Sequence, residues 1–280
     1  MRRLFRKKSK DTAFNNSQLS LYAGILESDF VHYGYFDDPG VEPASLSLEQ
    51  IRKAQERYSE RIIDLLNTND APVLDVGAGM GGISRMMMGK GVQPVALTPD
   101  RTQIAFLRER HPNLEIIEGR FQSVDWTPHY GRFGTILNAE SLQYITLDHA
   151  FDLVPRLLRA GGSWLICDYF RVNQSIENSG HRWDQFRDRA LADGWSFRHE
   201  EDITDHVLPG LGFVHLLGLR FVRPLFDYLD ARLERSHPAA RYALEDVIVR
   251  QDARLEESFI SVNPDAFAKQ KRYMLVALTR

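Results

Sequence analysis

The stretch Val73–Gly82 constrains this chain more than any other part of the sequence. It begins with a short apolar run that predicts a buried strand, and the glycines that follow predict a tight turn before a helical pattern over 83–88. Strand, turn and helix N-terminus together favour a nucleotide site, because a ligand can lie against bare backbone. The spacing Gly77-x-Gly79-x-Gly81 is not the fingerprint G-x-G-x-x-G, and no acidic residue ends the second strand, so an NAD-dependent oxidoreductase is disfavoured.

Length and composition point to one elaborated α/β domain. The chain has 280 residues, of which 43% are hydrophobic and 26% are charged, as in ordinary globular proteins. The net charge of −3 predicts that nucleic acid is not a partner. The single cysteine, Cys167, permits neither an intrachain disulfide nor a cysteine cluster for zinc. We therefore expect no metal site and a reducing, cytoplasmic location.

The N-terminus begins with a basic run inside residues 1–17. No apolar h-region of a signal peptide follows it, and no stretch of the chain reaches the roughly 18 apolar residues of a transmembrane helix. We predict a disordered tail. The alternative is weak contact with anionic lipid, because clustered Lys and Arg each contribute about 1 kcal/mol near such a surface.

Strand-like and helical segments alternate along the chain with short links. This alternation predicts an α/β fold with a doubly wound, Rossmann-like, mostly parallel sheet of seven strands. An N-terminal helical lid would precede the sheet, and a helical cap would be inserted before the last strand. The predicted strands are 72–76, 93–98, 114–119, 133–139, 163–169, 195–199 and 271–278.

The predicted segments are a tail (1–17), a helical lid (18–70), a core (71–204), a helical substrate cap (205–270) and a final core strand (271–280). Residues 207–229 of the cap are strongly apolar, and a helix is predicted over 239–259. The alternative for this insert is that it packs on the sheet edge or forms the face of a homodimer. Glycines and prolines are predicted to interrupt the first part of the insert, at Pro209, Gly210, Gly212, Gly218 and Pro224.

Asp75 stands two residues before the first glycine of the turn, and with it the stretch resembles motif I of the class I S-adenosylmethionine (SAM) methyltransferases. Residues 96–103 resemble the G-L/I-T-L-S-x-x-Q segment of the cyclopropane fatty acid synthase, mycolic acid and tocopherol methyltransferase branch. The resemblance covers residues 30–170 and implies SAM as cofactor and S-adenosylhomocysteine as product. The cofactor-binding residues that it implies here are Asp75, Gly77, Ala78, Gly79, Gly81, Thr98 and Gln103.

The loop 32–37, of sequence His-Tyr-Gly-Tyr-Phe-Asp, resembles the H-x-G-Y/F-Y/W-D loop of the same group, which includes sarcosine-type N-methyltransferases. The resemblance implies that Tyr33 and Tyr35 close over the methionine part of SAM, where aromatic faces favour the sulfonium cation. Arg120 stands where relatives often carry an acidic residue for the adenine, and stacking by Phe121 is the expected replacement. Asn138 stands where the chain passes under the cofactor.

The segment 138–144 resembles the E-S-x-x-H or E-V-x-E-H motif of this branch. The resemblance implies that Glu140 points toward the reaction centre, and Tyr144 and His32 are the other catalytic candidates. Tyr144 replaces the histidine of the motif, and Tyr33 replaces the loop cysteine of cyclopropane synthases. Both departures argue against cyclopropanation and for ordinary methyl transfer.

The sequence thus predicts a SAM-dependent methyltransferase that acts on a small molecule. The apolar insert favours a hydrophobic acceptor such as a lipid, terpenoid, quinone or polyketide, and leaves C-, N- and O-methylation open. Two alternatives remain. One is a related enzyme that uses SAM for cyclisation or isomerisation without methyl transfer, and the other is a catalytically inactive binding module.

Overall fold

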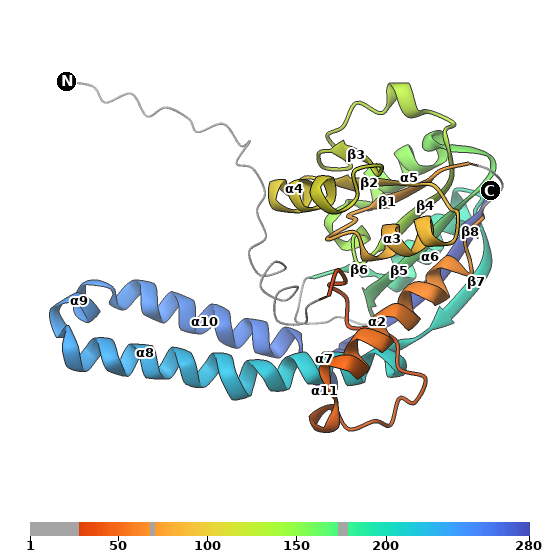
Figure 1. Cartoon of the computed structure of the whole chain (residues 1–280). Coiled ribbons are helices and arrows are strands. Elements are labelled where there is room, and N and C mark those ends of the chain that lie inside the picture. The colour runs from red at the N-terminus through yellow and green to blue at the C-terminus, as the bar shows by residue number, and fades with distance from the viewer. Residues whose placement is uncertain (1–27, 68–70, 173–178) are drawn as a thin grey trace, which may run out of the picture.

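The computed structural model describes residues 28–67, 71–172 and 179–280, and Figure 1 shows their arrangement. The predicted tail and the start of the predicted lid lie outside the described residues. The strands are β1 (Val73–Val76), β2 (Pro94–Thr98), β3 (Glu115–Glu118), β4 (Phe133–Ala139), β5 (Leu158–Arg171), β6 (His181–Arg182), β7 (Ser196–Asp202) and β8 (Lys271–Thr279). The helices and short helical turns are η1 (Pro43–Ser45), α2 (Leu48–Ile63), α3 (Gly82–Gly89), α4 (Arg101–Arg110), η2 (Thr127–His129), η3 (Leu142–Tyr144), α5 (Leu147–Leu157), α6 (Trp183–Ala192), α7 (Thr204–Leu217), η4 (Gly218–Val222), α8 (Arg223–Ser236), α9 (Pro238–Ala243), α10 (Glu245–Ser261) and α11 (Pro264–Gln270).

The strands form one sheet in the order β3-β2-β1-β4-β5-β8-β7. Neighbours from β3 to β5 are parallel, whereas β8 runs antiparallel to both β5 and β7. The short β6 adds an eighth strand beside the end of β5. The predicted Rossmann-like α/β class is confirmed. The strand order reverses between β1 and β4, and at such a switch point the carboxyl ends of parallel strands border a crevice.

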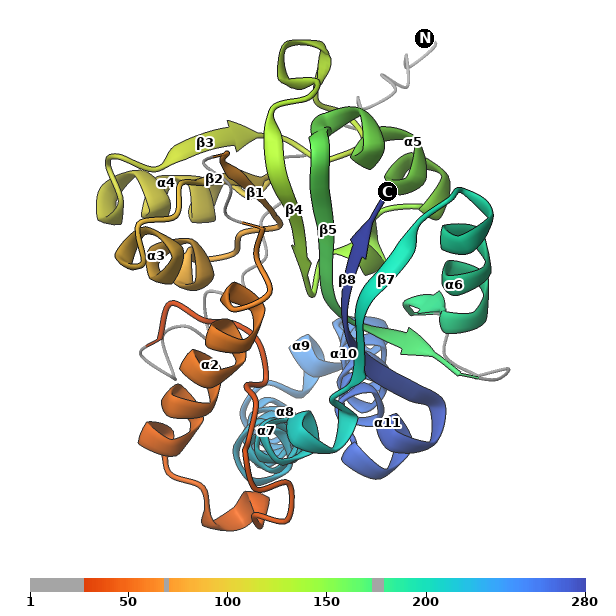
Figure 2. The ribbon, with the colours of Figure 1, turned by 90° about the vertical axis from the view of Figure 1, so that its right-hand side faces the viewer.

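Two hydrophobic clusters cover the two faces of the sheet (Figure 2). Helices α5 and α6 pack on one face around the fully buried Trp164 and Phe186. Helices α2, α3, α7 and α11 contribute to the cluster on the other face, which contains Tyr58, Met87 and Tyr273. Strands β1 and β2 are buried along their whole length, as expected for parallel strands covered on both faces.

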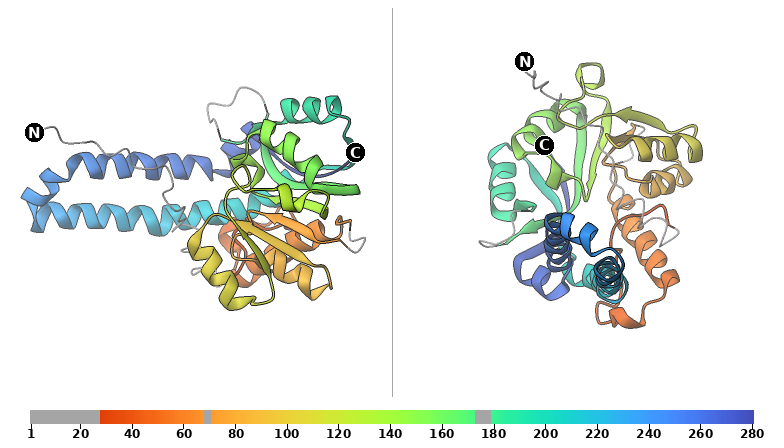
Figure 3. Two further views of the ribbon diagram at one scale, coloured as in Figure 1. Left: turned by 90° about the horizontal axis from the view of Figure 1, so that it is seen from above. Right: turned by 90° about the vertical axis from the view of Figure 1, so that its left-hand side faces the viewer.

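The insert between β7 and β8 differs from the prediction. Helix α7, the π-helical turn η4 and α8 follow one another without a break in the helical backbone, and the chain then returns through α9 and α10. Figures 1 and 3 show α8 and α10 side by side as a hairpin that projects from the body of the molecule. The predicted interruptions are therefore wrong at Pro209, Gly210, Gly212, Gly218 and Pro224.

The glycines of this insert allow close packing instead of ending helices. A Cβ at Gly210 would lie 1.9 Å from the carbonyl oxygen of Tyr33, and one at Gly212 would lie 2.7 Å from Cγ of Pro43. Both distances are shorter than any van der Waals contact, so only glycine lets α7 approach the N-terminal loop this closely. The described helices include none that is long and apolar enough to cross a membrane.

The close approach at Gly210 leads to a stability prediction. Although alanine is the better helix former, we expect Gly210→Ala to lower the free energy of unfolding by about 1–3 kcal/mol, because the new methyl group overlaps the Tyr33 carbonyl. Gly89→Ala is the matched control: Gly89 is also helical, and nothing lies within 4 Å of the position that its new methyl group would take. Urea unfolding of both variants measures the difference, and a Gly210→Ala protein as stable as Gly89→Ala contradicts the packing explanation.

Candidate active site

The glycine turn lies at the carboxyl end of β1, beside the switch point. Gly77, Gly79 and Gly81 have φ values of 77°, 58° and 86°, which side chains strongly disfavour. The N–H groups of Gly77 and Ala78 donate to the carbonyl of Leu97, which ties the turn to β2. The turn therefore delivers the chain to the N-terminus of α3 with its backbone close to the crevice.

Asp75 occupies β1 immediately before this turn. Its side chain is buried, and Oδ2 accepts a hydrogen bond of 2.7 Å from Oγ of Ser84, on the first turn of α3. Burial raises the pKa of Asp75 to about 6, while the hydrogen bond from Ser84 opposes the rise. A carboxylate in this place is a strong acceptor for a ligand's N–H or O–H group.

Thr98 and Gln103 meet at the end of β2. Both side chains are buried, and Oγ1 of Thr98 donates to Oε1 of Gln103 over 2.6 Å. Asp100 caps α4 by accepting from the backbone N–H groups of Thr102 and Gln103. Asp100 thus begins the helix, and Thr98 and Gln103, both predicted to bind the cofactor, contact each other at the end of β2.

Glu140 follows β4, the strand on the other side of the switch point. Its φ of 53° is the one positive value for a non-glycine residue among the described residues, and such backbone strain is found preferentially at functional sites. Its N–H donates to the carbonyl of Cys167 over 2.9 Å. Its carboxylate accepts a 2.5 Å hydrogen bond from the hydroxyl of Tyr273 and another from the backbone N–H of Tyr33.

The environment of Glu140 favours its protonated form. Burial raises the pKa of Glu140 to about 8, and the nearby carboxylate of Asp168 adds to the rise. The hydrogen bonds from Tyr273 and Tyr33 act in the opposite direction. The side chain is nevertheless partly exposed, so it is accessible from the crevice.

A second row of aromatic side chains supports Glu140. The hydroxyl of Tyr58, on α2, lies 3.0 Å from the hydroxyl of Tyr273 and donates to the carbonyl of Cys167 over 3.2 Å. The ring of His32 stacks on Tyr58 at 4.0 Å. Sequence reasoning missed Tyr58 and Tyr273, because neither belongs to a motif and 133 residues separate Tyr273 from Glu140.

Asp168, also missed, shapes the turn after Glu140. Its buried carboxylate accepts from the backbone N–H groups of Gln143 and Tyr169, at 3.3 and 2.8 Å. Burial raises the pKa of Asp168 to about 7, and these backbone donors oppose the rise. Tyr169 in turn donates to the side chain of Gln143. Asp168 therefore holds η3 against the end of β5, beside the crevice.

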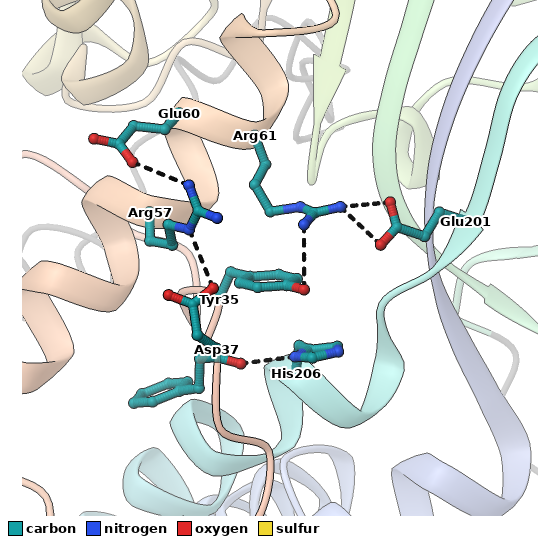
Figure 4. A network of polar contacts seen from close by, with 8 residues as sticks. Tyr35, Asp37, Arg57, Glu60, Arg61, Glu201 and His206 are labelled. Carbon is teal, nitrogen blue, oxygen red and sulfur yellow. Dashed lines mark hydrogen bonds and ion pairs between the residues drawn. The ribbon is translucent and has the colours of Figure 1, made fainter.

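The loop 32–37, which we call the aromatic loop, is anchored to α2 and α7, and through α2 to β7, as Figure 4 shows. The guanidinium of Arg61, on α2, binds both carboxylate oxygens of Glu201 on β7 and donates to the hydroxyl of Tyr35 over 3.3 Å. The ring of Tyr35 stacks on His206 of α7 at 4.4 Å, and His206 lies 2.7 Å from the carbonyl oxygen of Phe36. Tyr35 thus fastens the loop to the insert, and its predicted contact with a cofactor stays a prediction.

The residues just before this loop lie on the glycine turn. A Cβ at Gly79 would be 3.2 Å from Val31, and one at Gly82 would be 2.3 Å from the ring of Phe30. An ion pair of 3.6 Å between Asp29 and Arg85 of α3 accompanies this contact. In this conformation the segment covers the turn directly.

Other predicted residues lie outside this arrangement. His32 is buried behind Tyr58, where burial lowers its pKa to about 3, so it is neutral. Phe121 packs in the core against Trp126, and the amide of Asn138 is bonded to Ser141 and Trp164. Arg120 is exposed, and so is Tyr144, at 73%. The structure therefore brings together Tyr33, Asp75, the glycine turn, Thr98, Gln103 and Glu140 along the carboxyl edge of the sheet.

Comparison with known proteins identifies a domain that spans β1 to β5. Residues 73–162 match the family model described as "Methyltransferase domain". Ribosomal RNA small subunit methyltransferase A of Porphyromonas gingivalis is 39% identical over 66 residues, which are 22% of this chain and 26% of that protein. An uncharacterized methyltransferase of Staphylococcus carnosus is 26% identical over 123 residues, which are 43% of this chain and 58% of that protein. The chain thus matches only part of the length of these relatives.

Solved structures resemble nearly the whole chain. A protein assigned as a sarcosine dimethylglycine methyltransferase, from Galdieria sulphuraria, has a TM-score of 0.69 at 15% identity over 94% of this chain and 98% of its own. The [4+2]-cyclase SpnF has a TM-score of 0.65 at 16% identity, over 94% of both chains. Geranyl diphosphate C-methyltransferase of Streptomyces coelicolor has a TM-score of 0.64 at 16% identity, over 94% of this chain and 97% of its own. At such low identities the likeness concerns the fold. Residues 73–162 match the methyltransferase-domain model, and the chain as a whole has the fold of SAM-dependent small-molecule methyltransferases.

Proposed function

We propose that this protein is a SAM-dependent methyltransferase that transfers a methyl group to a small, hydrophobic acceptor. One observation carries the proposal: Asp75 with its glycine turn and Glu140 with Tyr273 lie at the ends of β1 and β4, on either side of the switch point. Asp75 and the glycine turn suit the binding of a nucleoside-like ligand, and Glu140 with Tyr273 suits a catalytic role beside that ligand. The matched methyltransferase domain covers both strands.

The residues at this edge fit SAM. The buried carboxylate of Asp75 would accept hydrogen bonds from the amine-bearing or hydroxyl-bearing part of the ligand, and the glycine turn would lie against it. Thr98 and Gln103 would meet the ribose side. When bound, SAM supplies a methyl group on a positively charged sulfur. The carboxylate of Glu140 and the aromatic ring of Tyr33 are groups that favour such a cation.

Catalysis would consist mainly of positioning, because the methyl group moves in line from donor to acceptor. Glu140 is held in place by Tyr273 and by the backbone of Tyr33, so its orientation is fixed before an acceptor arrives. For a hydroxyl acceptor, ionised Glu140 would take the proton. For an amine or a carbon acceptor, its charge would stabilise positive charge that develops near it.

The acceptor side is aromatic. Tyr33, Tyr169 and Tyr273 belong to the hydrophobic cluster around Glu140, with Ala139 and Phe267 nearby in the same cluster. Pockets lined by such side chains with a few polar groups bind apolar small molecules. These contacts support a hydrophobic acceptor, and α7 of the predicted cap reaches this cluster through Gly210, which lies against Tyr33.

The segment 29–31 would act as the lid. Phe30 and Val31 lie on the glycine turn, so this segment has to move before SAM can reach the backbone there. Gln55 of α2 donates to the carbonyl of His32 over 2.8 Å, and Arg61 and His206 fasten the loop that follows, so the moving part would end before His32.

Methyl-labelled SAM tests the activity itself. Incubation of the protein with labelled SAM and fractionated small-molecule extracts is expected to give a labelled apolar product, together with S-adenosylhomocysteine. Product formation without transferred label would instead support the cyclase alternative, since the [4+2]-cyclase SpnF has the same fold. If the protein does not bind SAM in a titration calorimeter, the inactive module is supported and the proposal fails.

Substitutions separate the roles of the two carboxylates at pH 7. We expect Asp75→Asn to weaken SAM binding by at least about tenfold, because it replaces a charged acceptor by a weaker one. We expect Glu140→Gln to leave SAM affinity within a few-fold, since a carboxyl with a pKa of about 8 is then mostly protonated, and to reduce turnover by about 100-fold. Calorimetry gives the affinities, and initial rates with the labelled acceptor give turnover.

Asp148→Asn is the control for this pair, because its side chain is 88% exposed and lies on the far helix α5. It should change neither quantity. Unchanged SAM affinity in Asp75→Asn would refute the cofactor site, and unchanged turnover in Glu140→Gln would refute the catalytic role alone.

The raised pKa of Glu140 predicts how SAM binding depends on pH. A bound cation favours ionised Glu140, so binding near pH 6 must release its proton, whereas binding above about pH 8 does not. The association constant for SAM should therefore rise by a few-fold between about pH 6 and about pH 8 and then level off. In Glu140→Gln this rise should be lost, and S-adenosylhomocysteine, which lacks the sulfonium charge, should show less of it. The same pH profile in both proteins would exclude Glu140 as the group responsible.

A further inference from the structure

The helical hairpin formed by α8 and α10 has an internal seam. Phe226 and Leu233 of α8 and Ile248 and Leu255 of α10 are the half-buried apolar residues along it. Arg223 crosses the seam, with its guanidinium 2.7 Å from Asp252 and 2.8 Å from Glu256 of α10. One face of α8 is therefore packed against α10.

A different face of the same helix carries apolar side chains that face solvent. They are Phe221 (65% exposed), Val222 (46%), Leu225 (58%), Tyr228 (58%) and Leu229 (53%), and we call these five residues the α8 stripe. Leu225, Tyr228 and Leu229 of α8 lie within an arc of about 100° at roughly 100° per residue, and Phe221 and Val222 precede them on the π-helical turn η4, which runs into α8. The seam residues Phe226 and Leu233 lie about 100° around from Leu225 by the same count.

The α8 stripe contains no charged side chain. Arg223 and Asp227 fall within the same stretch of sequence, but they form an ion pair of 3.0 Å with each other. Arg223 also pairs with Asp252 of α10. Scattered apolar residues are normal on a protein surface, whereas a continuous uncharged stripe of large side chains marks a contact surface. The hairpin projects from the body in Figures 1 and 3, so the other described residues lie to one end of it.

The order of the residues in the stripe is symmetrical about Leu225. Phe221 and Leu229 are each four residues from it, and Val222 and Tyr228 are each three residues from it. If two α8 helices cross antiparallel at Leu225, Phe221 of each faces Leu229 of the other, and Val222 faces Tyr228. An interface with two-fold symmetry requires this reciprocity.

We propose that the α8 stripe is the surface through which two copies of this chain associate, with the two α8 helices antiparallel about an axis at Leu225. Arg232, which continues the stripe, supports the antiparallel arrangement. In the antiparallel arrangement the two Arg232 side chains lie at opposite ends of the contact, whereas parallel helices would bring these two positive charges together. The depletion of charge in the centre and a charged residue at the rim are typical of protein interfaces.

The charges of the hairpin favour a second copy over a lipid surface as the occupant. Residues 218–261 contain seven arginines and no lysine against eight aspartates and glutamates, so they carry a net charge of −1 with His neutral. Helices that lie on membranes have an excess of basic residues on the polar face. The inference does not depend on the proposed function, since SAM and the acceptor play no part in it.

Analytical ultracentrifugation of the full chain at micromolar concentrations tests the proposal. We expect the wild-type protein to sediment with twice the mass of one chain, and Leu225→Arg to sediment as a monomer because it places two arginines on the two-fold axis. Val249→Arg is the matched control: Val249 is 60% exposed on α10 of the same hairpin, outside the stripe, and this variant should remain a dimer. Equal melting temperatures would show that all three proteins fold.

A cysteine cross-link tests the position of the axis. The native Cys167 is fully buried, so Leu225→Cys adds the one accessible thiol. Mild oxidation should convert most of Leu225→Cys into a disulfide-linked dimer, whereas Val249→Cys should stay uncross-linked. A monomeric wild-type protein, a Leu225→Arg dimer, or equal cross-linking of the two cysteine variants overturns the proposal. Flotation of a monomeric wild-type protein with anionic vesicles, lost in Leu225→Arg, would overturn it in favour of a lipid occupant.

Discussion

The carboxylate of Glu140 is the point on which distant parts of this structure depend. It accepts hydrogen bonds from the hydroxyl of Tyr273 in the last strand and from the backbone N–H of Tyr33 in the N-terminal loop. Its own N–H is fixed to Cys167 of β5, whose carbonyl also accepts from Tyr58. A partly exposed, strained residue is thereby held by three segments of the chain, and Tyr58 of α2 supports two of them. Such strain persists only where the surroundings determine the conformation several times over.

The same constraint joins the N-terminal loop to the late insert. Gly210 lets α7 touch the carbonyl of Tyr33, while the N–H of Tyr33 binds Glu140, so the backbone of Tyr33 is held on both sides of its Cα. The stack of Tyr35 on His206 and the ion pair of Arg61 with Glu201 continue this connection outward (Figure 4). The loop, the insert and the crevice therefore form one unit, and a change in any of them reaches the carboxylate at the proposed reaction centre.

Much of the fold could be predicted from local patterns. A short run such as Val73–Val76, followed by a glycine turn, is typical of a buried parallel strand. Such a strand is covered by helices on both faces, so all of its residues are buried. The helices of the insert could not be predicted in the same way, because glycine has a low helix propensity and its presence predicts that a helix ends. At Gly210 and Gly212 that cost is outweighed by close packing against Tyr33 and Pro43, which sequence periodicity does not reveal. Similarly, the local pattern gave no reason to connect Tyr58 and Tyr273 with Glu140.

The sequence by itself determined the edge of the sheet at which a ligand would bind. Asp75, the glycine turn, Thr98 and Glu140 lie at or directly after the end of a predicted strand, Gln103 lies on the helix after the second strand, and parallel strands bring their carboxyl ends together. Only the tertiary structure decided which side chains face one another there. It placed His32 behind Tyr58, Tyr35 against His206 and Tyr273 on Glu140, because these contacts join residues far apart in sequence and depend on how helices and strands pack. Local sequence sets the path of the backbone, whereas the partners of each side chain are set by packing between distant elements.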